Sequence, residues 1–192
     1  MALVILVFLV TDLKRPGTHT SVFRNSRTVL TRNFSLFLVV MGIFALGAYD
    51  FSFVLVKATA LGVDSTTISL VYATLNVATV IVGLPSGLLA DRFGKERVLL
   101  IGFGVFFVSS LAALTTTAGA LLAFPLAFIY GAYVGISDTL QRALVPSFVS
   151  SELKGTAYGI YYLVIGSCSL VANVLFGALW DLISMSAAYT YS

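Results

Sequence analysis

Between two long apolar segments the chain reads Gly87-Leu-Leu-Ala-Asp91-Arg92-Phe93-Gly94-Lys95-Glu96-Arg97. Five of these eleven residues are charged, whereas the flanking segments, residues 65–90 and 98–137, carry no charge. A glycine at position 94 permits the positive φ that a sharp turn requires. The pattern therefore predicts a tight polar hairpin that joins two membrane-spanning helices.

The composition of the whole chain also indicates a membrane protein. Of the 192 residues, 59% are hydrophobic and 10% are charged, and the mean hydropathy is +1.02. Soluble domains carry about 25% charged residues, so we expect lipid to be the solvent of this chain. The net charge of +3 does not indicate a nucleic-acid partner, because the basic residues lie in loops and form no continuous face.

The uncharged intervals predict the helices, since a membrane span needs about 20 apolar residues. The interval 98–137 is long enough for two spans, divided at the polar segment Thr115-Thr-Thr-Ala-Gly119. The expected fold is all-α, a polytopic transmembrane helix bundle with five full spans and two partial ones. The full spans are expected at residues 34–57, 66–90, 97–114, 119–141 and 156–179.

Both ends of the sequence resemble pieces of further helices. Residues 1–10 are apolar but too short to cross a bilayer, and they lack the basic n-region of a signal peptide. We interpret them as the end of a truncated transmembrane helix, residues 11–33 as a basic central loop, and residues 34–192 as the transmembrane bundle. Residues 186–192 are interpreted as the start of a further span, so we expect the chain to be a fragment of a longer protein.

The basic residues predict an orientation, because cytoplasmic loops are rich in Lys and Arg. If all five spans cross the membrane, the segments 11–33, 91–97 and 142–155 lie on one side and hold ten of the 11 basic residues. Lys57 lies on the other side. We therefore expect a multi-pass protein of the cell membrane, in contact with the lipid bilayer, with these three segments in the cytoplasm.

Glycines four residues apart predict close contacts between helices, because lipid does not push apolar helices together and small residues let their backbones approach. The pattern occurs three times, at Gly83 and Gly87, at Gly131 and Gly135, and at Gly155 and Gly159.

The charged hairpin resembles the loop signature of the major facilitator superfamily, whose pattern is Gly-x-x-x-Asp-(Arg/Lys)-x-Gly-(Arg/Lys)-(Arg/Lys). The sequence departs from this pattern at Glu96, where the family usually has a base, and the next residue restores that charge. We expect the aspartate to accept hydrogen bonds at a nearby helix N-terminus. An ordinary basic turn is the alternative. The residues assigned to the signature are Gly87, Asp91, Arg92, Gly94, Lys95 and Arg97.

The resemblance covers nearly the whole chain and favours the C-terminal half of such a protein, because an apolar segment and a long basic loop precede the first full span. It implies that residues 1–10 end helix six, that the five spans are helices seven to eleven, and that residues 186–192 begin helix twelve. It also implies secondary active transport of a small solute by alternating access, with a proton gradient as one candidate driving force. The implied partners are a small-molecule substrate and the missing N-terminal half of the same chain.

Asp50 lies well inside a predicted span. At 1.5 Å per residue it is about 24 Å from the start of that span, in the outer part of a hydrocarbon core about 30 Å thick. A desolvated carboxyl group tends to take up a proton, so Asp50 is a candidate for coupling to protons or substrate. The alternative is a structural role near the outer gate, either an ion pair with Lys57 or another polar contact.

Other polar residues within the spans are candidates for a substrate pathway, because polar groups at membrane depth normally face protein or a water-filled cavity. Interhelical hydrogen bonds and packing are the alternative. After Arg97 the span 97–114 has only two serines as polar residues, and it is expected to lie at the periphery. The pathway candidates besides Asp50 are Asn76, Tyr130, Tyr133 and Asn173.

Asp138 and Arg142 lie four residues apart and therefore share a helix face, at the cytoplasmic end of a span. By resemblance to the family, such a pair near the signature turn belongs to a charge network that stabilises one state of the gate. A simple salt bridge at the helix end is the alternative.

An enzyme is not expected. Catalysis within a membrane needs acids or histidines that converge at one depth, but the eight acids are scattered and the single histidine, His19, lies in a predicted loop. The sequence has no Gly-x-x-x-x-Gly-Lys-(Ser/Thr) run for a nucleotide. We therefore expect no catalytic residues, no cofactor and no metal site. The alternative to transport is a non-transporting membrane module, or a truncated remnant that acts only with a partner half.

Overall fold

The computed structural model describes residues 29–192, and this part of the chain is helical throughout apart from short turns. The expected helix end at 1–10 and most of the expected central loop lie outside the described residues. Five helical segments are long and apolar enough to cross a membrane, which confirms the predicted all-α bundle with five full spans. These segments are Arg32–Ala60, Ile68–Phe93, Lys95–Thr115, Ala120–Ser147 and Ser151–Leu182.

The first span is not one continuous helix. α3 (Arg32–Gly47) ends at a glycine, and α4 (Phe51–Ala60) begins after Asp50. The span predicted at 34–57 is therefore divided by residues 48–50. Aspartate strongly favours the position before a helix, where its side chain accepts from free backbone N–H groups. Asp50 therefore favours the start of a new helix inside an otherwise apolar run.

The remaining helices follow the predicted order. Gly94 connects α5 and α6 with a φ of 95°, a value that glycine adopts without steric cost. Three short 3₁₀ turns, at Ala120–Leu122, Val145–Ser147 and Ser151–Leu153, adjoin the later helices. The helices are α5 (Ile68–Phe93), α6 (Lys95–Thr115), α7 (Ala123–Leu144), α8 (Lys154–Leu182) and α9 (Met185–Tyr191).

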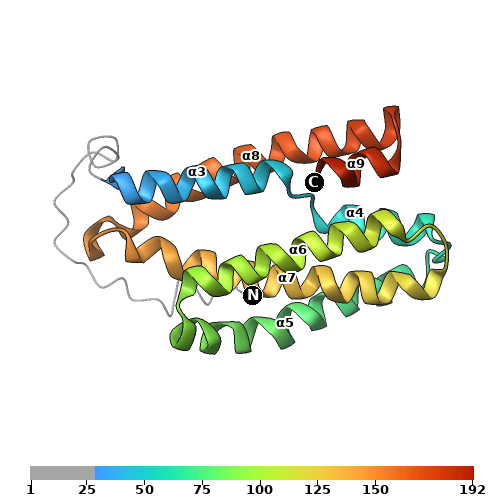
Figure 1. The fold of residues 1–192 in the computed structure, drawn as a ribbon, viewed down its shortest axis with the longest axis horizontal. Coiled ribbons are helices and arrows are strands. Elements are labelled where there is room, and N and C mark those ends of the chain that lie inside the picture. The colour runs from blue at the N-terminus through green and yellow to red at the C-terminus, as the bar shows by residue number, and fades with distance from the viewer. Residues whose placement is uncertain (1–28) are drawn as a thin grey trace, which may run out of the picture.

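The helices form two groups (Figure 1). In one group α8 packs against α3 and α9, and in the other α7 packs against α5 and α6. α4 packs on α5 and α7, although it continues the same span as α3. The break at residues 48–50 therefore carries the chain from the first group to the second.

The basic residues of the described chain gather at one end of the bundle. Figure 1 places the start of α3, the hairpin between α5 and α6, and the connection from α7 to α8 at this end. The Lys95 Nζ donates to the Ala143 carbonyl oxygen at 3.1 Å and so ties the hairpin to the end of α7. Lys57, near the end of α4, lies toward the opposite end. This one-sided distribution of charge is the feature on which the expected orientation rests.

α5 and α7 approach each other most closely at Gly131 and Gly135. A Cβ at Gly131 would lie 2.2 Å from the Leu75 carbonyl oxygen, and a Cβ at Gly135 would lie 2.4 Å from that of Thr79. The Thr79 hydroxyl donates to the Gly131 carbonyl oxygen at 3.1 Å across the same contact. Small residues make such backbone contacts possible between membrane helices.

The other predicted glycine contacts form only in part. Gly83 faces the α7 backbone at Gly135, and Gly87 meets only the Thr139 methyl group at 3.8 Å. A Cβ at Gly155 or Gly159 would meet no atom within 4 Å, so the prediction for this third pair is wrong within the described residues. These two glycines lie in α8, which packs little against the helices of the second group.

Replacing Gly131 by alanine is expected to lower the free energy of unfolding in detergent by about 2 kcal/mol, because α5 and α7 must separate to admit the methyl group. Gly104→Ala is the matched control, since a Cβ there would meet no atom within 4 Å. The control should be as stable as the unsubstituted protein or slightly more stable, because alanine favours helix. Thermal unfolding measures both, and equal stability of the two variants would contradict the close contact.

Asp64 fixes the start of α5 from the loop that follows α4. Its carboxylate accepts from the backbone N–H groups of Thr66, at 2.8 Å, and Thr67, at 3.0 Å, and from both threonine hydroxyls. These hydrogen bonds, with the Thr66 hydroxyl contributing most, lower the pKa of Asp64 to about 2. Each of them favours the ionised form of the carboxyl group.

The stability that Asp64 contributes is therefore expected to be fully present above its unfolded-state pKa of about 4 and to be lost as the pH falls through about 2. Asp64→Asn should melt at a lower temperature than the unsubstituted protein at neutral pH, and the difference should shrink as the solution is acidified to about pH 2. Thermal unfolding of both proteins across this range tests the prediction. A difference that does not change with pH would contradict it.

Candidate functional site

A cavity of about 490 Å³ lies between the two helix groups. Its walls come from α3, α5, α7 and α8, from the break at residues 48–50 and from Phe51 at the start of α4, and α6 contributes none of its lining residues. α6 is therefore peripheral to the cavity, although it packs closely on α7. The structure brings all five pathway candidates together in this cavity: Asp50, Asn76, Tyr130, Tyr133 and Asn173.

Two of these residues bind the backbone groups that the break leaves free. The buried Tyr130 hydroxyl donates to the Tyr49 carbonyl oxygen at 2.7 Å. The Asn173 Oδ1 accepts from the Asp50 backbone N–H at 2.9 Å. An interrupted helix is tolerated at membrane depth only where protein or cavity water supplies such partners. Because Tyr130 lies on α7 and Asn173 on α8, both helix groups hold the break in place.

Asp50 is the N-cap of α4, and its carboxylate accepts from the Ser52 backbone N–H at 3.0 Å. The ion pair with Lys57, one of the alternatives considered from the sequence, is not formed. The buried Lys57 instead directs its Nζ toward the Met185 Sδ at 2.9 Å and lies 5.6 Å from the centre of the Tyr189 ring. The two residues do not share a helix face, because α4 begins only after Asp50.

Asn76 and Tyr133 complete the polar wall without bridging helices. The Asn76 Nδ2 donates to the Tyr72 carbonyl oxygen of its own helix at 2.8 Å. Tyr133 is buried against the rings of Phe44, Phe106 and Tyr130, and its hydroxyl has no hydrogen-bond partner among the described residues. The alternative of interhelical hydrogen bonding therefore applies to Tyr130 and Asn173 but not to this pair.

The signature residues lie at the basic end of the bundle, and none of them lines the cavity. The guanidinium of Arg92 lies 5.4 Å from the centre of the Phe93 ring, and Arg97, like Asp91, is exposed. Within residues 29–192 the structure gives Asp91 no hydrogen bond, so the expected contact with a helix N-terminus is not present. Glu96 lies in the first turn of α6 and supplies the negative charge that the positive end of that helix favours.

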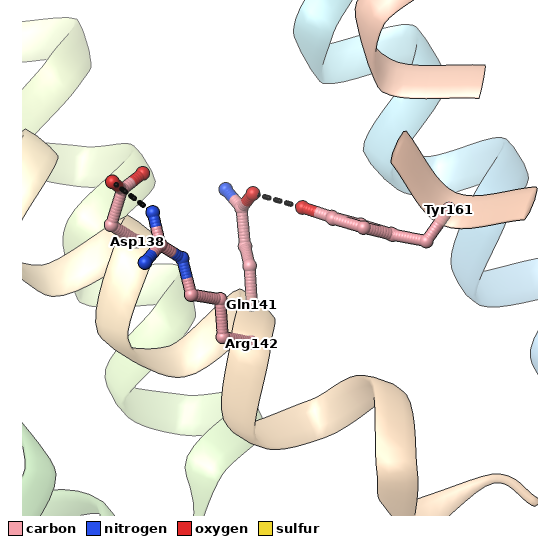
Figure 2. Close-up of polar contacts among 4 residues, drawn as sticks. All are labelled: Asp138, Gln141, Arg142 and Tyr161. Atoms are coloured by element: carbon pink, nitrogen blue, oxygen red, sulfur yellow. Dashed lines mark hydrogen bonds and ion pairs between the residues drawn. The ribbon is translucent and has the colours of Figure 1, made fainter. Parts of the chain in front are cut away.

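Figure 2 shows the polar contacts at the same end of α7. Asp138 and Arg142 form an ion pair at 3.2 Å with both side chains largely exposed, and exposed pairs contribute only about 0–1 kcal/mol. The Tyr161 hydroxyl of α8 donates to the Gln141 side-chain oxygen of α7. The ion pair lies within one helix, so it does not join α7 to α8. That contact is made by Tyr161 with Gln141 and by the Tyr158 hydroxyl, which donates to the Arg142 carbonyl oxygen at 2.6 Å.

Several residues that line the cavity were not predicted from the sequence. They follow from helical spacing, since side chains three, four or seven positions from Asn76 and Tyr130 face the same side of their helices. Such a count finds the missed lining residues Tyr72, Thr79, Val134 and Ser137.

Tyr130→Phe is expected to lower the free energy of unfolding by about 1 kcal/mol, because it leaves the buried Tyr49 carbonyl without its donor. Tyr133→Phe removes a hydroxyl from the same helix and the same cavity without breaking a hydrogen bond. It should therefore lower the free energy of unfolding by less than Tyr130→Phe does. Thermal unfolding in detergent compares the two. The account of the break is contradicted if Tyr133→Phe is the more damaging substitution.

Comparison with known proteins agrees with this architecture. A sequence model of the Major Facilitator Superfamily matches residues 2–191. The chain is 27% identical over 184 residues to an uncharacterised MFS-type transporter of Methanocaldococcus jannaschii, an alignment that covers 92% of this chain and 46% of that protein. It is 34% identical over 99 residues to an uncharacterised MFS-type transporter of Mycobacterium tuberculosis, covering 51% of this chain and 17% of that protein.

The chain therefore spans less than half the length of each of these relatives. The family match extends over nearly all of its residues, and its five apolar helices are those of a multi-pass membrane protein. The chain belongs to the major facilitator superfamily.

Proposed function

We propose that this chain is the C-terminal half of a secondary active transporter that moves a small solute by alternating access. Family membership and the MFS-type relatives support transport in general. The observation that carries the proposal further is the interrupted first span, whose residues 48–50 face a polar cavity between two helix groups. Discontinuous helices at membrane depth supply substrate and ion sites in many secondary transporters.

The contacts at the break suit a hinge in such a cycle. Between α3 and α4 the Tyr49 carbonyl oxygen accepts from the Tyr130 hydroxyl, and the Asp50 N–H donates to Asn173, so side chains take the place of helical partners at these two backbone groups. Side-chain hydrogen bonds are remade more easily than a helix is unwound, and a few residues between helices commonly absorb the change in domain closure. In the proposed cycle, movement of one helix group against the other changes the access to the cavity between them.

Asp50 is proposed as the coupling residue. It is the acid at the break, it lines the cavity, and within residues 29–192 it has no basic partner. Taking up a proton removes the negative charge of its carboxylate, and this changes both the N-cap of α4 and the attraction of the cavity for a solute. A proton gradient thereby becomes the candidate driving force.

The opposite end of the bundle is proposed as the cytoplasmic gate. There the signature hairpin contacts α7 through Lys95, which donates to the Ala143 carbonyl oxygen, and the preceding residue, Arg142, forms the ion pair with Asp138. The segments 11–33, 91–97 and 142–155 are proposed to lie in the cytoplasm, since basic loops remain there. The protein is proposed to act in the cell membrane together with an N-terminal half that closes the cavity, and to catalyse no covalent reaction.

Asp50→Asn is expected to abolish accumulation driven by a pH gradient while the protein remains folded and expressed. The measurement is uptake from a mixture of labelled metabolites into proteoliposomes that contain the native protein, with and without an imposed gradient. A pH-sensitive dye inside the vesicles reports the accompanying proton movement. Asp181→Asn is the matched control, because it removes an exposed carboxylate that does not line the cavity.

The unsubstituted protein and the control should both accumulate at least one solute beyond equilibrium. If Asp50→Asn keeps the same dependence on pH, Asp50 is not the coupling residue. If no solute accumulates with any gradient, the proposal of secondary transport is wrong, and the non-transporting membrane module becomes the better description.

A further inference from the structure

The charged residues that line the cavity within residues 29–192 all have one sign. Its charged lining residues are Asp50 and Asp138, and no lysine, arginine or histidine lines it in the part of the chain that the structure describes. Asp138 is neutralised by Arg142 at 3.2 Å. Lys57 is turned toward Met185 and Tyr189. Asp50 is therefore left as the carboxylate of this wall whose charge no described side chain compensates.

The Asp50 carboxylate retains room for a further partner. One of its oxygens accepts from the Ser52 backbone N–H, whereas an ionised carboxylate has about four acceptor positions. The side chain is partly exposed and lies on the cavity surface. In surroundings of low dielectric such a charge attracts a cation strongly and opposes the entry of an anion.

Aromatic side chains line the same cavity as this acid. Six of the cavity-lining residues carry aromatic rings. Phe51 directly follows the acid in the chain, and its ring centre lies 5.5 Å from that of Tyr72. The face of an aromatic ring is negative and attracts organic cations, and it also provides apolar surface for a flat ligand. The six residues are Phe44, Tyr49, Phe51, Tyr72, Tyr130 and Tyr133.

We infer that the cavity binds an organic cation that carries an aromatic or similarly flat apolar group. The charged nitrogen lies at Asp50, and the flat group lies against the rings of Phe51 and Tyr72. The volume of about 490 Å³ falls within the range of roughly 300–1,000 Å³ that is typical of small-molecule sites. This inference names the substrate class of the proposed transporter and therefore rests on that function.

Equilibrium binding to the purified native protein tests the substrate class separately from transport. The probes are 1-methyl-4-phenylpyridinium, a permanent cation, and biphenyl-4-carboxylate, an anion of similar shape and size. The cation is expected to bind at least tenfold more tightly than the anion. Asp50→Asn is expected to weaken binding of the cation at least tenfold, whereas Asp181→Asn, which removes a carboxylate outside the cavity, should change it less than twofold.

Two further variants distinguish the loss of an aromatic contact with the ligand from a loss of protein stability. Tyr72→Leu is expected to weaken binding of the cation about threefold or more, and Tyr72→Phe, which keeps the ring, should leave it within twofold. Thermal unfolding without ligand identifies any variant that has lost its fold.

Tighter binding of the anion, unchanged affinity of Asp50→Asn for the cation, or failure of the folded protein to bind the cation would each overturn the inference. Uptake of the same cation into vesicles distinguishes failure of the proposed cation site from failure of the proposed transport function. Binding without gradient-driven uptake would leave the cation site intact and refute transport. Uptake of neutral or anionic solutes alone would leave transport intact and refute the cation site.

Discussion

Lipid offers no hydrogen bonds, and this constraint accounts for the arrangement around residues 48–50. Once α3 ends at Gly47, the free backbone groups at the break need partners from protein or from water in a cavity. Tyr130 of α7 and Asn173 of α8 provide two of them, and the Tyr191 hydroxyl donates to the Leu46 carbonyl oxygen at the end of α3. The break therefore determines where three other helices place their polar side chains.

The same break explains why the cavity is polar. It connects two helix groups that pack chiefly within themselves, and its polar backbone and Asp50 face the space between them. The helices that line this space are those with polar residues at depth, while α6 turns an apolar face outward. A bundle of largely uncharged helices thus has two acids, Asp50 and Asp138, and six aromatic side chains lining one cavity.

Much of this site could be predicted from the sequence, because the free-energy cost of a polar side chain depends on its depth in the bilayer. A polar residue such as Asn76 or Asn173 in the middle of an apolar span needs a protein or water environment, and one cavity accommodates both.

The break was not predicted, since an aspartate within an apolar run shows its position along the span but not whether it caps a new helix. Asp50 therefore lies in the cavity with the other pathway candidates, but the alternative of an ion pair with Lys57 is not realised, because Lys57 lies on a helix that begins after Asp50. Contacts such as Gln141 with Tyr161 depend on how two helices meet, which neither helix encodes alone.

The central claim is that the break at residues 48–50 lies at membrane depth but faces a cavity that water can enter. Accessibility of single cysteines to a membrane-impermeant thiol reagent tests it most directly, after Cys168 has been replaced by alanine. Ala48→Cys, at the cavity wall, should react, and Val39→Cys, exposed on α3 away from the cavity, should be protected by lipid. Protection of Ala48→Cys together with labelling of Val39→Cys would contradict this account.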